Sequence, residues 1–150
     1  MNTKWVSSIE AVSRTRLRTV GRSSLVADVA KLLSDTHISL VVVCNPNGAM
    51  EGIITKTNIV QQIGHCQGAG RISTAAELMV QNVTYCRPTD YLPDVLAMMA
   101  ERGFVHIPVV DEHSIPLGVV NARDALRALL AEEEYEESLL RDYVMGIGYR

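Results

Sequence analysis

Two short stretches of the chain place polar residues directly after an apolar strand, in a pattern that could hold an anion. They are Gly52-Ile53-Ile54-Thr55-Lys56-Thr57-Asn58 and Gly118-Val119-Val120-Asn121-Ala122-Arg123-Asp124. In each stretch, a glycine and two β-branched residues predict a buried strand, and the polar residue that follows can cap a helix. The N-terminus of a helix presents unpaired N–H groups and a partial positive charge, which suit a phosphate group.

The side chains at these junctions allow two interpretations. Lys56 and Arg123 fall in the first turn of the expected helices, where a cation is unfavourable for the helix dipole unless an anion binds beside it. Asp124 has acceptor oxygens for two ribose hydroxyls. Alternatively, Asp124 and Asn58 only satisfy N–H groups of the first helical turn. The spacing of the residues favours neither interpretation.

The two junctions belong to an internal duplication with a constant offset of 66 residues and no gap. Among the matches, Asp28-Val29 aligns with Asp94-Val95 and Asn45 aligns with Asp111. Apolar residues match apolar residues, and turn residues match turn residues, over about forty positions. A register held for that length predicts two copies of one structural unit.

Each copy has the residue pattern of a strand, a helix, two strands and a second helix. The first copy is expected to hold a strand near 17–20, a helix with Leu25, Val29, Leu32 and Leu33 on its apolar face after a Ser23-Ser24 cap, strands at 40–43 and 52–54, and a helix with Ile59, Val60 and Ile63 on its apolar face. The second copy is expected to hold a strand at 83–86, a helix with Leu92, Val95, Leu96 and Met99 and with Pro93 in its first turn, strands at 106–110 and 118–120, and a helix with Ala125, Leu126, Leu129 and Leu130.

The predicted fold class is α/β (α+β), with one β-α-β-β-α unit in each repeat. About sixty residues with three short strands cannot exclude much water alone. Two such units are therefore expected to pack face to face with pseudo-twofold symmetry. That arrangement creates two equivalent clefts.

Composition excludes several classes of function. Hydrophobic residues make up 47% of the chain and charged residues 21%, which predicts a folded domain with a sizeable core. The formal net charge of −3 argues against a nucleic-acid partner. We interpret the nearby arginines as solvated loop and strand-edge residues; they are Arg14, Arg16, Arg18 and Arg22.

The remaining sequence features also narrow the function. No apolar run is long enough for a membrane span, the first ten residues lack the layout of a secretory signal, and the three cysteines show no paired spacing. We therefore expect a cytoplasmic protein with free thiols and no membrane association. The sequence contains no nucleophile elbow, P-loop or metal-spaced His/Cys cluster, so we predict neither an enzyme nor a metal site.

The junctions, the duplication and the segment His106-Ile107-Pro108-Val109-Val110-Asp111 together resemble the CBS (cystathionine β-synthase) domain pair, also called a Bateman module. Ala76-Glu77-Leu78-Met79 followed by Val83 also looks like that family. The resemblance covers roughly residues 6–131. It suggests a first repeat at 6–64, a linker at 65–73, a second repeat at 74–131 and an acidic helical tail at 132–150.

The resemblance implies that adenosine ligands bind in the clefts: AMP, ADP or ATP, and less commonly S-adenosylmethionine or NAD, with no cofactor required. Carried over by position, one site uses Thr84, Tyr85 and Cys86 around the base, Val119 beneath it, Asn121 and Arg123 near phosphate, and Asp124 on ribose. The other site uses Arg18, Thr19 and Val20 with Ile53, Thr55, Lys56 and Asn58.

Each site departs from the family pattern at one position. The first has Asn58 where an acid is usual, and the second has Asn121 where a hydroxyl is usual. We expect the Asp124 site to bind better, because a carboxylate makes stronger hydrogen bonds than an amide. His106 faces the cleft either as a phosphate contact or as a core histidine with one satisfied nitrogen.

The sequence thus predicts a regulatory sensor that binds an adenine nucleotide and acts on an unknown effector protein. A homodimer is expected, as CBS pairs commonly form one. The apolar stripe in the tail is a candidate contributor to it; its residues are Leu139, Leu140, Tyr143 and Val144. The alternative is a structural interaction module whose cleft is degenerate and empty.

Overall fold

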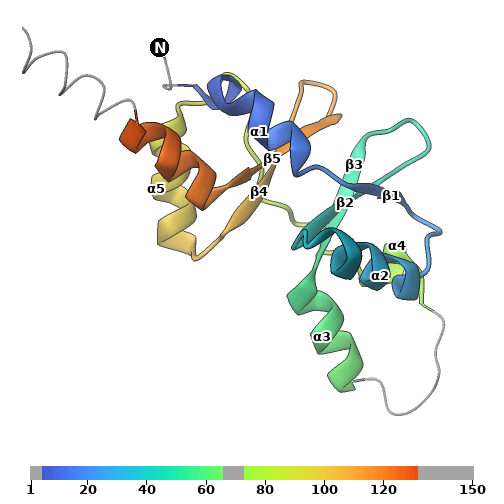
Figure 1. Cartoon of the computed structure of the whole chain (residues 1–150). Helices are drawn as coiled ribbons and strands as arrows, with labels where there is room; N and C mark the ends of the chain where they lie inside the picture. Colours follow the sequence, from blue (N-terminus) through green and yellow to red (C-terminus); the bar gives the residue numbers. More distant parts are fainter. Residues whose placement is uncertain (1–4, 66–72, 132–150) are drawn as a thin grey trace, which may run out of the picture.

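A computed structural model describes residues 5–65 and 73–131 as two α/β lobes joined by extended segments (Figure 1). The first lobe contains β1 (Thr19–Gly21), α2 (Val26–Thr36), β2 (Leu40–Cys44), β3 (Met50–Thr55) and α3 (Lys56–His65). The second lobe contains α5 (Leu92–Arg102), β4 (His106–Val110), β5 (Pro116–Asn121) and a helix over residues 122–131. Short helices precede each lobe: η1 (Val6–Ile9) and α1 (Glu10–Thr15) before the first, and α4 (Ala75–Leu78) before the second. The predicted acidic tail and most of the linker lie outside the described residues.

The strand pairing confirms the duplication. In the first lobe β1 runs parallel to β2, and β2 pairs antiparallel with β3 from Leu40↔Thr55 to Cys44↔Met50. In the second lobe β4 pairs antiparallel with β5 from His106↔Asn121 to Val110↔Pro116. Every one of these pairs lies 66 residues after its counterpart, and the two sheets share a register shift at the same place. We call residues that are 66 apart matched positions.

One predicted strand is reduced to a single bridge. The strand expected at 83–86 shortens to Cys86, which pairs in parallel with Val109 and matches the Val20↔Val43 pair of the first lobe. The Cys86 N–H donates to the carbonyl of Pro108 at 2.9 Å, and the Val110 N–H donates to the Cys86 carbonyl at 3.0 Å. Within the predicted strand only Cys86 is buried, and Tyr85 is exposed.

Helix ends also differ from expectation in one place. α2 begins after Leu25, which is extended and makes no side-chain cap, so the predicted Ser23-Ser24 cap is wrong. The Ser24 hydroxyl instead accepts a hydrogen bond from the Gly21 N–H at 3.2 Å and closes the turn before the helix. Pro93 lies in the first turn of α5, as predicted. At the other ends, α2 and α5 stop at the matched residues His37 and Gly103, both in the left-handed region.

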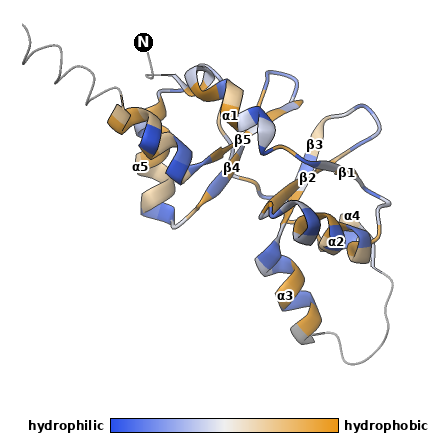
Figure 2. Cartoon of the chain, in the orientation of Figure 1, coloured by the Kyte–Doolittle hydropathy of each residue, from blue (hydrophilic) through white to orange (hydrophobic). Residues whose placement is uncertain are grey.

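Each lobe has its own apolar core, and apolar stretches run along the central strands and along α3 (Figure 2). The first core includes Val29, Leu33 and Ile54, which are fully or nearly fully buried. The second core includes residues of α5, β4 and β5, namely Leu92, Met99, Ile107 and Val120, of which Met99 and Val120 match Leu33 and Ile54. The predicted apolar faces of the two last helices are only partly covered: Ile59 and Ala125 are buried, whereas Val60, Ile63, Leu126 and Leu130 are exposed within this chain.

The segment before each lobe packs against the other lobe. Val6 and Ile9 belong to the core of the second lobe, whereas Ala75 and Met79 belong to the core of the first. Both contacts rest on glycine: a Cβ at Gly118 would lie 2.7 Å from the Ser13 hydroxyl, and a Cβ at Gly52 would lie 2.8 Å from the Val80 carbonyl oxygen. A small third cluster, with Leu40, Val42 and Val119 at its centre, joins the lobes. We call the segment before each lobe its leading segment. Because each leading segment packs against the core of the other lobe, we call this arrangement crossed packing.

Candidate ligand-binding clefts

An open cleft of about 650 Å³ lies between the lobes. One wall is the end of β3 and the first turn of α3, which supply Ile53, Thr55, Lys56 and Asn58. The opposite wall comes from the segment before the second lobe and from the start of β4; it includes Asn82, Val83, Thr84, Phe104, Val105 and His106. This volume is in the range of pockets that hold small organic ligands.

On the polar wall of this open cleft, Thr55 and Asn58 are joined by three reciprocal hydrogen bonds. Asn58 Oδ1 accepts from the Thr55 N–H at 2.9 Å and from the Thr55 hydroxyl at 3.0 Å, while the Asn58 N–H donates to Thr55 Oγ1 at 3.2 Å. These bonds use the oxygen of the Asn58 amide and leave its NH₂ group as a donor. The capping and ligand-binding interpretations of Asn58 are thus compatible in the same residue.

The charge of the open cleft suits an anion. Among the described residues that line it, none is acidic, and Lys56 is the one lysine or arginine. Lys56 sits at the start of α3, where the helix N-terminus adds a partial positive charge. The apolar remainder of the wall includes Ile53, Val83 and Phe104. A ligand that combines a flat apolar group with a negatively charged group would match both parts.

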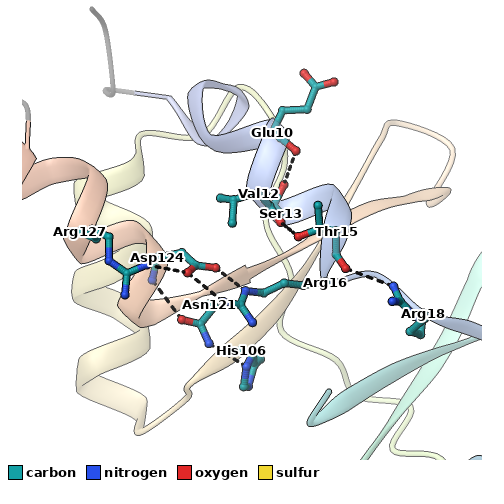
Figure 3. Close-up of polar contacts among 10 residues, drawn as sticks. All are labelled: Glu10, Val12, Ser13, Thr15, Arg16, Arg18, His106, Asn121, Asp124 and Arg127. Atoms are coloured by element: carbon teal, nitrogen blue, oxygen red, sulfur yellow. Dashed lines mark hydrogen bonds and ion pairs between the residues drawn. The ribbon is translucent and has the colours of Figure 1, made fainter. Parts of the chain in front are cut away.

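The matched cleft on the other side is closed by Arg16 (Figure 3). Nε of Arg16 donates to Oδ2 of Asp124, and Nη2 donates to Oδ1 at 3.0 Å. The Asp124 side chain is 3% exposed, and Arg127 approaches its Oδ1 at 3.6 Å from the solvent side. The space left beside Arg16, His106 and Val119 is about 20 Å³, room for one water molecule rather than a ligand.

Asp124 heads a chain of hydrogen bonds that ends at His106. The Asp124 N–H donates to Asn121 Oδ1 at 3.0 Å, and Asn121 Nδ2 lies 2.9 Å from His106 Nε2. Burial lowers the pKa of His106, the Arg16 cation lowers it further, and the Asp124 carboxylate opposes both. The pKa of Arg16 is raised by its hydrogen bond to Asp124. The polar side chains of the closed cleft thus bond one another.

The two predicted sets of site residues are grouped differently in the structure. Thr84 lines the open cleft with Thr55 and Asn58, not with Asp124, so each lobe's leading segment faces the junction of the other lobe. His106 borders both clefts. The structure also favours the opposite of the prediction that Asp124 marks the better site, because its carboxylate is already bound by Arg16.

The other predicted residues do not line the open cleft. Tyr85 is exposed with the Arg87 guanidinium 5.8 Å from its ring, and burial raises the pKa of the Cys86 thiol to about 12. Arg18 donates to the carbonyl oxygens of Thr15 and Leu17. Thr19 and Arg123 are exposed, Val20 packs against the core of the first lobe, and Val119 borders the small cavity.

Sequence reasoning missed Arg16 and its matched residue Asn82. The sequence predicts a solvated Arg16, but its guanidinium crosses to the second lobe and bonds Asp124. A signal was present, because the two copies differ at both members of this pair at once: Arg16 and Asp124 in one cleft stand where Asn82 and Asn58 stand in the other. Phe104 and Val105 were missed because they follow a helix end and carry no polar group.

Two proteins from other organisms have sequences similar to that of this chain. A 17.7 kDa protein of Acidianus ambivalens is 24% identical over 142 residues, covering 95% of this chain and 85% of that protein. The meiotically up-regulated gene 70 protein of Schizosaccharomyces pombe is 30% identical over 73% of this chain, which spans 16% of that longer protein.

Solved structures of CBS proteins share the fold. CBSX2 in complex with AMP superposes with a TM-score of 0.75 at 21% identity, over 87% of this chain and 98% of that one. The cytosolic domain of the Mg²⁺ channel MgtE in complex with ATP gives a TM-score of 0.63 at 24% identity, over 75% of this chain and 45% of that one. The CBS domain pair of MJ0100 in complex with 5'-methylthioadenosine and S-adenosyl-L-methionine gives a TM-score of 0.64 at 22% identity, over 77% of this chain and 90% of that one.

The family assignment rests on the sequence model of the CBS domain, which matches residues 6–65 and again residues 75–131. The two matches correspond to the two lobes with matched strand registers. Together the two matches cover most of the sequence. The chain therefore belongs to the CBS domain family and carries two CBS domains in tandem.

Proposed function

We propose that this chain is a regulatory module that binds an adenine nucleotide in the open cleft and passes that signal to a protein partner. The observation that carries the proposal is the cleft of about 650 Å³ with Lys56 at the α3 N-terminus and no acidic side chain among its described lining residues. The AMP and ATP complexes of CBSX2 and MgtE support a nucleotide as the ligand class.

The geometry suggests a role for each wall. The first turn of α3 and Lys56 favour the phosphates, since both are positive. The Asn58 NH₂ group is a donor for a ribose oxygen. Ile53, Val83 and Phe104 offer an apolar surface for adenine. A sulfonium ligand such as S-adenosylmethionine is less suited, because the cleft offers it no carboxylate among the described lining residues.

Isothermal titration calorimetry with adenosine, AMP, ADP and ATP tests the proposal. Wild type should bind the nucleotides, and Lys56→Gln should weaken binding more for ATP than for adenosine, because only phosphate contacts the lost charge. Arg123→Gln is the matched control: Arg123 also lies in a first helical turn but is exposed and outside the open cleft. Folded wild type that gives no heat with any of the four would refute nucleotide binding.

We also propose that the module is a homodimer. Val60 and Ile63 on α3 are 66% and 68% exposed, and Leu126, at the position matched to Val60, is 48% exposed. The helices that follow the two junctions thus present apolar side chains at matched places. A second copy of the chain supplies a surface of the same symmetry, which suits an isologous interface.

The alternative is an interaction module without a ligand. The closed Arg16–Asp124 cleft favours it, because one of the two clefts is already filled by protein atoms. The calorimetry above separates the two functions. A dimer that forms without any nucleotide binding would support the alternative.

A further inference from the structure

The two clefts of this chain differ at one coupled pair of residues. Arg16 and Asn82 are matched positions, and so are Asp124 and Asn58. Asn82 and Asn58 both line the open cleft, whereas Arg16 and Asp124 are bonded across the closed one. The cleft with the asparagine pair has a volume of about 650 Å³, whereas the space beside the Arg16–Asp124 pair is about 20 Å³.

The bond pattern shows why the closed cleft excludes a ligand. A guanidinium that meets a carboxylate with two parallel N–H donors occupies the oxygens that would otherwise accept from ribose hydroxyls. The Asp124 side chain is 3% exposed, whereas Arg16 is 37% and Arg127 70% exposed, so both cations lie on the solvent side of the acid and Arg16 makes the two hydrogen bonds to it. A ligand must displace Arg16 and leave it without its partner.

The small cavity beside this pair is also bordered by His37, Ser39 and Leu40 from the first lobe. Leu40 packs with Val119 in the cluster that joins the lobes. The Arg16 side chain therefore occupies a position between the lobes, at the place matched to the open cleft. Pairing with Asp124 turns what would be a second site into an interdomain contact.

We propose that Arg16 acts as an internal substitute for a ligand: its pairing with Asp124 closes the second cleft, and the chain takes one adenine nucleotide, in the Asn58 cleft. This inference rests on the proposed function for the identity of the ligand. Arg16 is a specificity-determining residue in this sense, because it decides which of two related clefts accepts a nucleotide.

The duplication supplies the variants that test this. In Arg16→Asn/Asp124→Asn, the closed cleft receives the residue pair of the open one, and no buried charge is left unpaired. In Asn82→Arg/Asn58→Asp, the open cleft receives the pair of the closed one. Titration of AMP by calorimetry should give one site per chain in wild type, two in the first variant and none in the second.

The outcomes separate this inference from the proposed function. A first variant that still binds one AMP, or a wild type that binds two, overturns the role of Arg16 while nucleotide binding stands. A wild type that binds none, with one site gained in the first variant, keeps the role of Arg16 and overturns binding in the open cleft. No binding in either protein overturns both.

The pairing itself has a test without nucleotide. The Arg16→Asn single variant leaves the buried Asp124 carboxylate with only the longer Arg127 contact at 3.6 Å, so it should unfold at lower urea concentration than the Arg16→Asn/Asp124→Asn double variant. Equal urea midpoints for the single and double variants would mean that Asp124 does not depend on Arg16 for its charge partner, and would overturn the proposal.

Discussion

His106 occupies the border of both clefts and accepts its hydrogen bond as a neutral ring. An amide nitrogen can only donate, so Asn121 Nδ2 requires Nε2 of His106 to be unprotonated. Asn121 cannot turn its oxygen to a charged ring without giving up the Asp124 N–H that Oδ1 accepts. Arg16 and Asp124 both act on the ring, and His37 and Lys56 border the same clefts.

We predict a loss of stability on acidification that depends on His106. The pKa of His106 in the folded chain lies below its ordinary value of 6.5. At pH values between these two pKa values, the unfolded chain therefore binds more protons than the folded chain. The resulting stabilisation is present above pH 6.5 and is lost as the pH falls through the folded pKa. Urea midpoints of wild type should fall from pH 7.5 to pH 5, and His106→Gln should show a smaller fall over that window. Equal falls would contradict the assignment.

The sequence predicted several of the residues that belong to the candidate sites, but not which segments of the chain face one another across each cleft. Thr55, Lys56, Asn58 and Asp124 were found from their place after a strand, since a local pattern places them at a helix N-terminus. Which leading segment faces which junction depends on the crossed packing, over more than one hundred residues in the case of Arg16 and Asp124. No local pattern reports a contact of that range.

At the scale of the elements, the ends of α2 and α5 form a natural comparison. The matched residues His37 and Gly103 both adopt the left-handed conformation, with φ of 58° and 75°. A Cβ at Gly103 would meet nothing within 4 Å, so the difference between the two ends is one of backbone strain alone. Only glycine adopts this conformation without steric cost.

We therefore expect opposite effects from exchanging the two residue types. His37→Gly should stabilise the chain and Gly103→Ala should destabilise it, each by about 1 kcal/mol, the cost of the left-handed conformation in a residue with a Cβ. Urea denaturation gives both free energies of unfolding. Ser114→Gly is a further check, since Ser114 has φ of 65° where the matched residue is Gly48. A destabilised His37→Gly would show that the imidazole makes a contact worth more than the strain.

The contacts between each leading segment and the other lobe leave no room for a side chain at two glycines, Gly118 and Gly52. Gly118→Ala should destabilise the chain by about 1–3 kcal/mol, because the new methyl group would overlap the backbone and hydroxyl of Ser13 in α1. Gly52→Ala should cost less, since Met79 is flexible and only the Val80 carbonyl oxygen is backbone. Gly21→Ala is the control, as a Cβ there would meet nothing within 4 Å. Gly118→Ala as stable as Gly21→Ala would refute this packing of α1.

The elements themselves were largely predictable, because hydrophobic periodicity reports local burial. The strands β2 to β5 and the helices α2, α3 and α5 lie where the pattern put them. The errors concern neighbours: the segment at 83–86 forms one bridge, and the apolar residues Val60 and Leu126 face away from both cores. Apolar periodicity predicts that a face will be covered but does not say by which surface.

At the scale of the molecule, the exposed faces of the two last helices predict an oligomer that can be split. Val60→Glu/Leu126→Glu should convert a dimer into a monomer, because a carboxylate buried at an interface costs several kcal/mol without a partner. Light scattering after size exclusion gives the mass. Leu25→Glu is the control, being an exposed apolar residue at the start of α2. A wild-type chain that is monomeric at high concentration would contradict the homodimer.

No helix among residues 5–65 and 73–131 is long and apolar enough to cross a membrane. Two isolated β-bridges tie the leading segments to the rest of the described chain: Trp5 pairs with Tyr91, and Leu25 pairs with Thr74. The Trp5 and Tyr91 rings meet edge to face, with centroids 5.9 Å apart.

The crossed packing dictates what a chain with a single repeat would have to do. Such a chain would carry a leading segment that fits the other repeat's core and would lack the one that fits its own. Two copies could satisfy each other only by trading leading segments, as in a domain-swapped pair. The duplication supplies both leading segments within one covalent chain, so the two halves need not be identical, and here one keeps a cleft while the other fills it with an arginine.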